Sequence, residues 1–306
     1  MENYYFLVDS AFLDTLNLEA QAKIRDDIDK YGKRNGIEKE KCRCYVILCP
    51  YCNSLATLIS RVVKIDEIEH SPFACAFCGE SPPYNKIVYS VEKAKILYDL
   101  CESCSAIDKK QENIQNERVL LEQSIVVLAT GIELYFKEIY ILSMDLKYVK
   151  PEYSLHSKFN RDVKNDFLNI GKTVSMFKTE FNINIKDILG IDIINKLNYL
   201  TLLRNVIVHN NGNVDNIFYS SIPDDKKKIC SKGQPVPISK NEILEFIQTV
   251  NIVLSKIEPE FDRLIRPELQ NRISENLGSG PNKTRKSNIK VPTFPSFCPH
   301  HSSFSK

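Results

Sequence analysis

The chain has 306 residues, of which 43% are hydrophobic, so it can bury a substantial core and has the length of two domains. Its 41 basic and 39 acidic residues leave a formal net charge of +2. This balance excludes a whole-protein field that would attract duplex DNA, so any nucleic-acid contact must be local.

The pattern along the chain predicts a mainly α protein in four parts. Residues 1–40 carry charge at helical spacing and predict a helical N-terminal segment. Residues 41–110 contain short β-branched and aromatic runs between cysteine pairs, which predict a small α+β zinc-binding module. Residues 111–270 have a helical apolar period and predict a helical bundle, whereas residues 271–306 are rich in serine, proline and basic residues and predict a disordered tail.

The bundle is predicted to contain four long helices. The first has an apolar face from Val119 to Ile139, and the others are expected at Phe159–Lys178, Ile185–His209 and Lys240–Leu264. Although Ser124 to Leu142 is the most apolar stretch, charged residues interrupt it. The N-terminus lacks a charged-then-apolar targeting signal. We therefore expect a soluble, cytoplasmic protein with no membrane contact.

Cysteine pairs dominate the N-terminal half of the chain. Ten cysteines in a sequence of cytosolic character indicate metal binding rather than disulfides. Two C-x-x-C pairs complete the tetrahedral four-thiolate shell that structural zinc prefers, and this shell leaves no open position for chemistry. We therefore assign zinc a role in folding. The predicted ligands are the three pairs Cys49 and Cys52, Cys75 and Cys78, and Cys101 and Cys104.

The spacing leaves the partners of each pair open. The pairs at 49/52 and 75/78 would give a ribbon-like site, whereas those at 75/78 and 101/104 would give a treble-clef-like site with a hairpin from KIVYSV and AKILYDL. In the second case Cys42 and Cys44 would complete another site with the first pair. HNH nucleases have similar metal-binding turns, but they need catalytic histidines, and none lies between Cys78 and Cys101.

A polar motif lies near the end of the apolar helix Ile193 to His209. It consists of Arg204, Asn205 and His209, and it is followed by the helix-stop signal Asn210-Asn211-Gly212. A buried arginine must be paired or must face a solvated cleft, and an RNA phosphate would be a suitable partner.

The R-N-x-x-x-H pattern followed by NNGNVD resembles the signature of HEPN domains. These are all-helical bundles, many of which cut RNA in bacterial toxins and antiviral defence systems. The resemblance covers roughly Gln111 to Arg266, and it implies that an acidic or hydroxyl residue of the first long helix faces the motif. Glu133 is the first candidate for that position, and Ser124 and Thr130 are weaker ones.

The resemblance implies a metal-independent ribonuclease with Arg204, Asn205, His209 and Glu133 as site residues. A neutral imidazole can take the proton from a ribose 2′-hydroxyl, which then attacks the adjacent phosphorus. The products would be a 2′,3′-cyclic phosphate and a 5′-hydroxyl. An arginine would hold the non-bridging oxygens as negative charge builds on them. The only metal expected is the structural zinc.

Helix geometry places His209 about 140° around the axis from Arg204 but only about 40° from Asn205. In HEPN nucleases the motif helices of two domains meet, so the resemblance implies a homodimer. The other expected partners are the RNA substrate and an inhibitory or activating protein, because a toxic nuclease needs restraint. Two other functions stay open: a non-catalytic dimerising scaffold that binds RNA or protein, and an HNH-like or ribbon-type DNA-binding protein.

Overall fold

The structure is a computed structural model. It describes residues 5–7, 18–38, 42–49, 51–52, 55–61, 75, 78–106, 111–148, 161, 163 and 166–278. The chain divides into two compact units. The helical unit comprises Met1, Pro72–Ala74 and Glu80–Glu268. The cysteine unit comprises Glu2–Ser71, Cys75–Gly79 and Leu269–Lys306.

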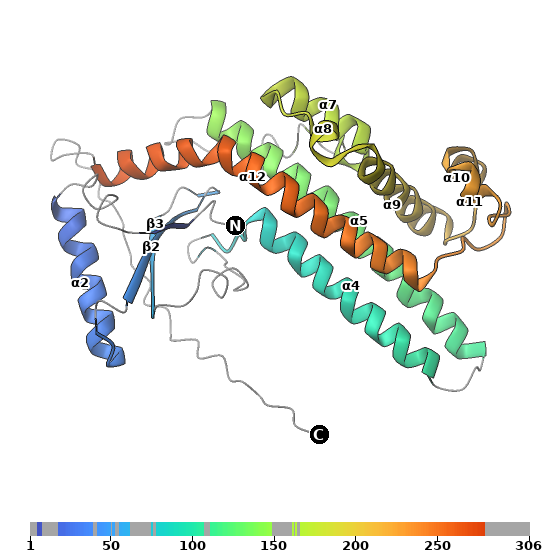
Figure 1. Cartoon of the computed structure of the whole chain (residues 1–306), viewed down its shortest axis with the longest axis horizontal. Helices are drawn as coiled ribbons and strands as arrows, with labels where there is room; N and C mark the ends of the chain where they lie inside the picture. The colour runs from blue at the N-terminus through green and yellow to red at the C-terminus, as the bar shows by residue number, and fades with distance from the viewer. Residues whose placement is uncertain are drawn as a thin grey trace. The chain divides into compact units, whose positions relative to one another are not determined.

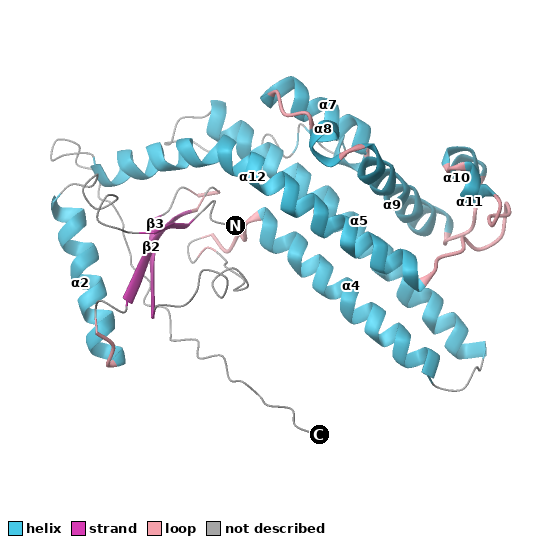
Figure 2. Cartoon of the chain, viewed as in Figure 1, coloured by secondary structure: helices cyan, strands magenta, loops and turns pink. Residues whose placement is uncertain are grey.

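The cysteine unit contains a small antiparallel sheet with the strand order β1-β2-β3. These strands are Tyr5–Leu7, Cys42–Leu48 and Leu55–Arg61, and helix α2 (Leu18–Asn35) precedes β2. Tyr45 of β2 pairs with Leu7 on one side and with Leu58 on the other. Ile24 of α2 is buried, as are Cys42 and Cys44 of β2, which share one face of the strand and contact α2. Figure 2 shows that the strands drawn in magenta all belong to this unit.

The helical unit begins with two long helices that form an antiparallel pair, α4 (Pro83–Ala106) and α5 (Gln111–Tyr148). Figure 1 shows this pair in cyan and green, with α7 to α11 in yellow to light orange. The remaining elements are the 3₁₀ turn η2 (Asp166–Leu168), α7 (Ile170–Phe181), α8 (Ile185–Leu189), α9 (Ile191–Asn210), α10 (Asn216–Ser221), α11 (Asp224–Lys227) and α12 (Lys240–Gly278).

An aromatic cluster joins four of these elements. Phe177 of α7 lies 6.1 Å from Phe136 of α5 and 5.2 Å from Phe261 of α12, measured between ring centroids. Phe167 of η2 is 6.3 Å from Phe177, again between centroids. All four side chains are almost fully buried. These aromatic contacts stabilise the bundle beyond the burial of apolar area alone.

The α4–α5 pair depends on a close approach at Gly131. A Cβ atom placed at Gly131 would lie 2.7 Å from the Cβ atom of Ser90 on α4. Only glycine leaves enough space for the two helices at this position. This is the reason for a glycine in the middle of an apolar helix, where it costs about 1 kcal/mol relative to alanine.

The described residues are mostly helical, as predicted, but the predicted KIVYSV/AKILYDL hairpin is wrong. Both runs belong to α4, which begins at Pro83. Each run alone has strand composition, but together their buried residues Ile87, Val91 and Ala94 recur at helical spacing. A proline in the first helical position fits because that position needs no backbone N–H. The bundle therefore starts before residue 111, and β1 interrupts the segment 1–40 that we predicted to be helical.

The helix predicted at Phe159–Lys178 is shorter than expected, and the last helix is longer. Helix α7 starts at Ile170, whereas α12 continues beyond Leu264 to Gly278. Helix α12 passes through Pro259 and Pro267 because both prolines are exposed, so that the carbonyl groups they leave unpaired can bind water. The predicted tail thus begins in a helix, and its remainder lies outside the described residues.

No helix in the described part of the chain is both long enough and apolar enough to cross a membrane.

Candidate functional site

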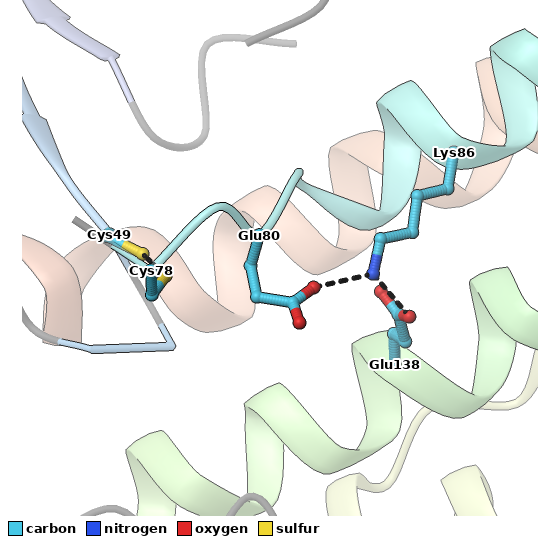
Figure 3. Close-up of polar contacts among 5 residues, drawn as sticks. All are labelled: Cys49, Cys78, Glu80, Lys86 and Glu138. Atoms are coloured by element: carbon cyan, nitrogen blue, oxygen red, sulfur yellow. Dashed lines mark hydrogen bonds and ion pairs between the residues drawn. The ribbon is translucent and has the colours of Figure 1, made fainter. Parts of the chain in front are cut away.

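Four cysteines of the cysteine unit converge on one point. Their sulfur atoms all lie within 4.8 Å of one another, and they come from Cys49, Cys52, Cys75 and Cys78. The Sγ atoms of Cys49 and Cys78 are 3.7 Å apart, as are those of Cys52 and Cys75 (Figure 3 shows the first pair). Each close contact therefore joins one C-x-x-C pair to the other.

These distances fit a tetrahedral metal site. Zinc–sulfur bonds of about 2.3 Å in a tetrahedron place neighbouring sulfur atoms about 3.8 Å apart. Gly79 follows the second pair with a φ of +76°, and its backbone N–H donates to the Cys75 carbonyl over 2.7 Å. This tight turn brings both thiols of the pair to the same side. The four cysteines are therefore compatible with a structural metal site.

The surroundings of Cys49 also suit a metal-bound thiolate. Burial is the main cause that raises the pKa of the Cys49 thiol far above its usual value, and hydrogen bonds from the backbone of Cys52 and Tyr51 oppose this rise. Backbone N–H groups that point at a sulfur atom stabilise its thiolate form. A bound cation would favour the thiolate further, because metals bind cysteine in the deprotonated form.

The pair at Cys101 and Cys104 does not belong to this cluster. Both residues lie on α4 in the helical unit, where Cys101 is buried and its thiol faces the Glu117 carbonyl oxygen at 3.9 Å. Their prediction as zinc ligands, and the treble-clef-like site with them, finds no support in the described residues. Cys42 and Cys44 lie on β2, and burial raises the pKa of Cys44 to about 12. These two residues are core side chains.

A charged cluster begins two residues after Cys78. Lys86 of α4 donates to Glu138 of α5 over 2.6 Å and to Glu80 over 3.2 Å (Figure 3). Burial lowers the pKa of Lys86, but the hydrogen bond to Glu138 and the two negative charges outweigh it, so that the pKa is raised. Sequence reasoning did not find this cluster, because its residues are far apart in the chain.

The motif helix α9 ends as the sequence predicts. Asn211 is the C-terminal capping residue with a φ of 51°, and its backbone N–H donates to the Val206 carbonyl oxygen. The N–H of Gly212 donates to the same oxygen over 3.1 Å. A left-handed cap followed by glycine is the expected stop for a helix of this kind. His209 therefore occupies the last turn of α9, where its side chain is exposed.

Arg204 and Glu133 line one small pocket of the helical unit. Its other walls come from α5, η2, the start of α7 and Thr201 of α9. Burial raises the pKa of Glu133, and the positive charge of Arg204 opposes this rise. The pocket has a volume of about 10 Å³, which is room for about one water molecule. Glu133 thus faces the motif, whereas Ser124 is buried and donates to the Leu120 carbonyl.

Asn205 connects Arg204 to the histidine side of the helix. The Nη1 of Arg204 donates to the Oδ1 of Asn205 over 3.0 Å. The carboxamide nitrogen of Asn205 then remains as a donor, on a side chain that lies about 40° around the helix from His209. His209 does not line the pocket that Arg204 and Glu133 share. The two ends of the motif therefore face different directions within one chain.

No family model, curated protein or solved structure matches the chain.

The end of α9 approaches an ion pair within α5. Arg118 donates to Glu122 over 2.7 Å, and a Cβ atom at Gly212 would lie 2.6 Å from the Glu122 carboxylate. The positive φ of 72° favours glycine at position 212, and a side chain there would displace the Glu122 carboxylate. Sequence reasoning missed the pair; the signal available was an Arg and a Glu four residues apart on a predicted helix.

Proposed function

We propose that this chain is a metal-independent endoribonuclease of the HEPN kind. The observation that carries the proposal is the arrangement of the motif. Arg204 is partly buried beside Asn205, and it shares a pocket with Glu133 of the first long helix. His209 lies exposed at the end of the same helix. Cleavage of an RNA phosphodiester requires a positive group and an accessible imidazole, and the motif helix carries one of each.

The proposed reaction is an internal transesterification. The imidazole of His209 takes the proton of a ribose 2′-hydroxyl, and the 2′-oxygen forms a bond to the adjacent phosphorus. The bond from phosphorus to the 5′-oxygen breaks, and that oxygen takes a proton from water, which the protonated His209 then restores. Arg204 binds the non-bridging oxygens, a bidentate task that suits its planar guanidinium group. The products are a 2′,3′-cyclic phosphate and a 5′-hydroxyl.

A second copy of the chain is needed because Arg204 and His209 diverge on one helix. The outer side of α9 supports this requirement, since its exposed and partly exposed side chains recur every three or four residues. These side chains are Asn195, Asn198, Leu202, Asn205 and His209. If two such faces meet about a twofold axis, Arg204 of each copy can act with His209 of the other. We therefore propose a homodimer with a composite active site.

Zinc is the metal that we propose for the four cysteines of the cysteine unit. Cys49, Cys52, Cys75 and Cys78 would hold it, and its contribution would be to the folding of that unit. RNA cleavage would proceed without a bound metal at the motif.

A complementation experiment tests both the chemistry and the composite site. Arg204→Ala and His209→Ala should each lower cleavage of total RNA by at least about a hundredfold. When the two variants are unfolded and refolded together, half of the dimers should be mixed, and activity should return because one intact Arg204 and one intact His209 share a cleft. The assay contains a magnesium chelator, and end-group analysis should find cyclic phosphates.

Two results would contradict the proposal. Cleavage that disappears when magnesium is removed while zinc is retained would overturn the metal-independent mechanism. If the wild-type protein binds RNA or dimerises but never cuts it, and His209→Ala changes neither property, the chain is a scaffold. Separate refolding of each variant is the matched control for the mixture. Activity that appears in the mixture, but not after each variant is refolded separately, shows that refolding by itself does not restore cleavage.

A further inference from the structure

The segment after the motif helix is held in a fixed position by a second segment. The backbone N–H of Val214 donates to Gln234 over 2.9 Å, and the N–H of Gly233 donates back to Val214 over 2.8 Å. A third bond runs from the N–H of Val236 to Gly212 over 2.8 Å. The turn that contains Lys232 is therefore hydrogen-bonded to Gly212 and Val214, which lie three and five residues after His209.

A lysine and a tyrosine meet at this turn. The Nζ of Lys232 lies 5.1 Å from the ring centroid of Tyr219, which belongs to the short helix α10. Lys232 is exposed and Tyr219 is partly exposed. Figure 1 shows α10 beside the end of α9. An aromatic ring and an ammonium group are thus presented together at the histidine end of the motif helix.

A second lysine–tyrosine pair, formed by Lys226 and Tyr199, has a structural role in the bundle. Lys226 lies 5.1 Å from the ring centroid of Tyr199, but this tyrosine is buried. Lys226 also donates to Glu242 over 2.5 Å, so its charge is already balanced. That pair serves the packing of α9 against the start of α12. Tyr219 packs against the core but stays partly exposed, and Lys232 is exposed, so a ligand can reach both.

We propose that Tyr219 and Lys232 form a binding site for single-stranded RNA next to His209. A nucleobase would stack on the Tyr219 ring, and Lys232 would contact a neighbouring phosphate. Stacking on a side chain needs an unpaired base, so the strand bound here is single-stranded and not duplex. The inference deepens the proposed ribonuclease function, on which it rests, because the site would position the strand for His209.

Binding can be measured without cleavage by using a fluorescent 12-nucleotide strand of 2′-O-methyl RNA, which has no 2′-hydroxyl to react. Tyr219→Leu should raise the Kd by about five- to 150-fold, since it keeps apolar packing but removes the stacking ring. Tyr219→Phe keeps the ring and should stay within about twofold of wild type. Lys232→Ala should weaken binding and should reduce the slope of log K against log salt by about 0.7.

Lys196→Ala is the matched control for Lys232→Ala. Lys196 is an exposed lysine near the opposite end of α9. Thirteen residues of helix place it about 20 Å from His209, so its removal should leave both the Kd and the salt slope unchanged. Thermal melting of each variant shows whether the fold is retained, and Tyr219→Phe provides a ring variant that is expected to fold.

The outcomes separate this inference from the proposed function. If wild type cleaves RNA but Tyr219→Leu and Lys232→Ala bind the strand as tightly as wild type, the inference is wrong and the nuclease stands. If wild type never cleaves RNA but both variants lose binding, the site stands and the nuclease falls. A salt slope that falls equally for Lys196→Ala shows diffuse electrostatic attraction and also overturns the inference.

Discussion

Burial and charge oppose each other at Glu133. Its carboxyl lies partly buried in the pocket that Arg204 also lines. Burial disfavours the charged carboxylate, and the guanidinium group favours it, but burial is the larger cause and the pKa is raised. A carboxyl in this state lowers the stability of the folded chain when it ionises.

We expect Glu133→Gln to raise the free energy of unfolding at pH 7 by a few tenths to about 1 kcal/mol, with allowance for solvent screening. Because the folded-state pKa of Glu133 lies above its unfolded-state value, ionisation costs stability when the pH exceeds both values. This cost disappears as the pH falls through them. Urea unfolding at pH 7 and at pH 3.5 should therefore show a gain only at pH 7.

Glu245→Gln provides the control for that measurement. Glu245 is exposed on α12, so its replacement should change the stability little at either pH. If Glu133→Gln destabilised the protein at pH 7, attraction to Arg204 would outweigh burial, and the raised pKa would be contradicted.

At the scale of elements, the α4–α5 pair depends on the absence of a side chain at Gly131. The two helices approach so closely there that a new methyl group would meet Ser90. The same α5 helix presents Glu133 to the motif helix two residues later. A shift of α5 relative to its neighbours would therefore change the pocket as well as the core.

Gly131→Ala should destabilise the helical unit by about 1–3 kcal/mol, because overpacking outweighs the better helix propensity of alanine. Adding Ser90→Gly removes both the Cβ and the Oγ atoms that the new methyl group would meet. The double variant should recover part of the loss, which thermal unfolding would measure. Ser90→Gly alone is the control, with an expected cost of about 1 kcal/mol. Additive losses in the double variant would show that the contact does not limit packing.

At the scale of the whole molecule, the two units have different sources of stability. The helical unit has a large buried core with many aromatic contacts. In the described part of the cysteine unit, Cys49, Tyr51 and Cys75 form a buried cluster. A metal bound by the four converging thiols would contribute directly to the folding of this unit.

We expect about one zinc per purified chain and complete loss of it in the Cys49→Ser/Cys78→Ser double variant. Elemental analysis measures the metal, and circular dichroism during heating measures the folding of each unit. The variant should lose the transition of the cysteine unit while the helical unit melts as before. Cys101→Ser/Cys104→Ser is the matched control, which should retain the metal. Loss of zinc in that control would return these cysteines to the ligand set.

Local patterns predicted those features whose causes lie close together in the chain. The end of α9 follows from Asn211 and Gly212, which suit a left-handed cap, and the apolar period of α5 follows from one buried face. Two C-x-x-C pairs can supply the four thiolates of a tetrahedral metal site. The resemblance in the Arg204 to His209 motif likewise needed no structure, although its activity stays a prediction.

Only the tertiary structure decided which of the distant residues meet. It joined the cysteine pairs at 49/52 and 75/78. It also placed Cys101 in the helical core, because the runs KIVYSV and AKILYDL belong to one helix. It also brought Glu133 to Arg204 and attached Lys232 near His209. The physical reason is that cysteine spacing and short apolar runs are satisfied equally well by several folds. The choice depends on which surfaces the rest of the chain can bury.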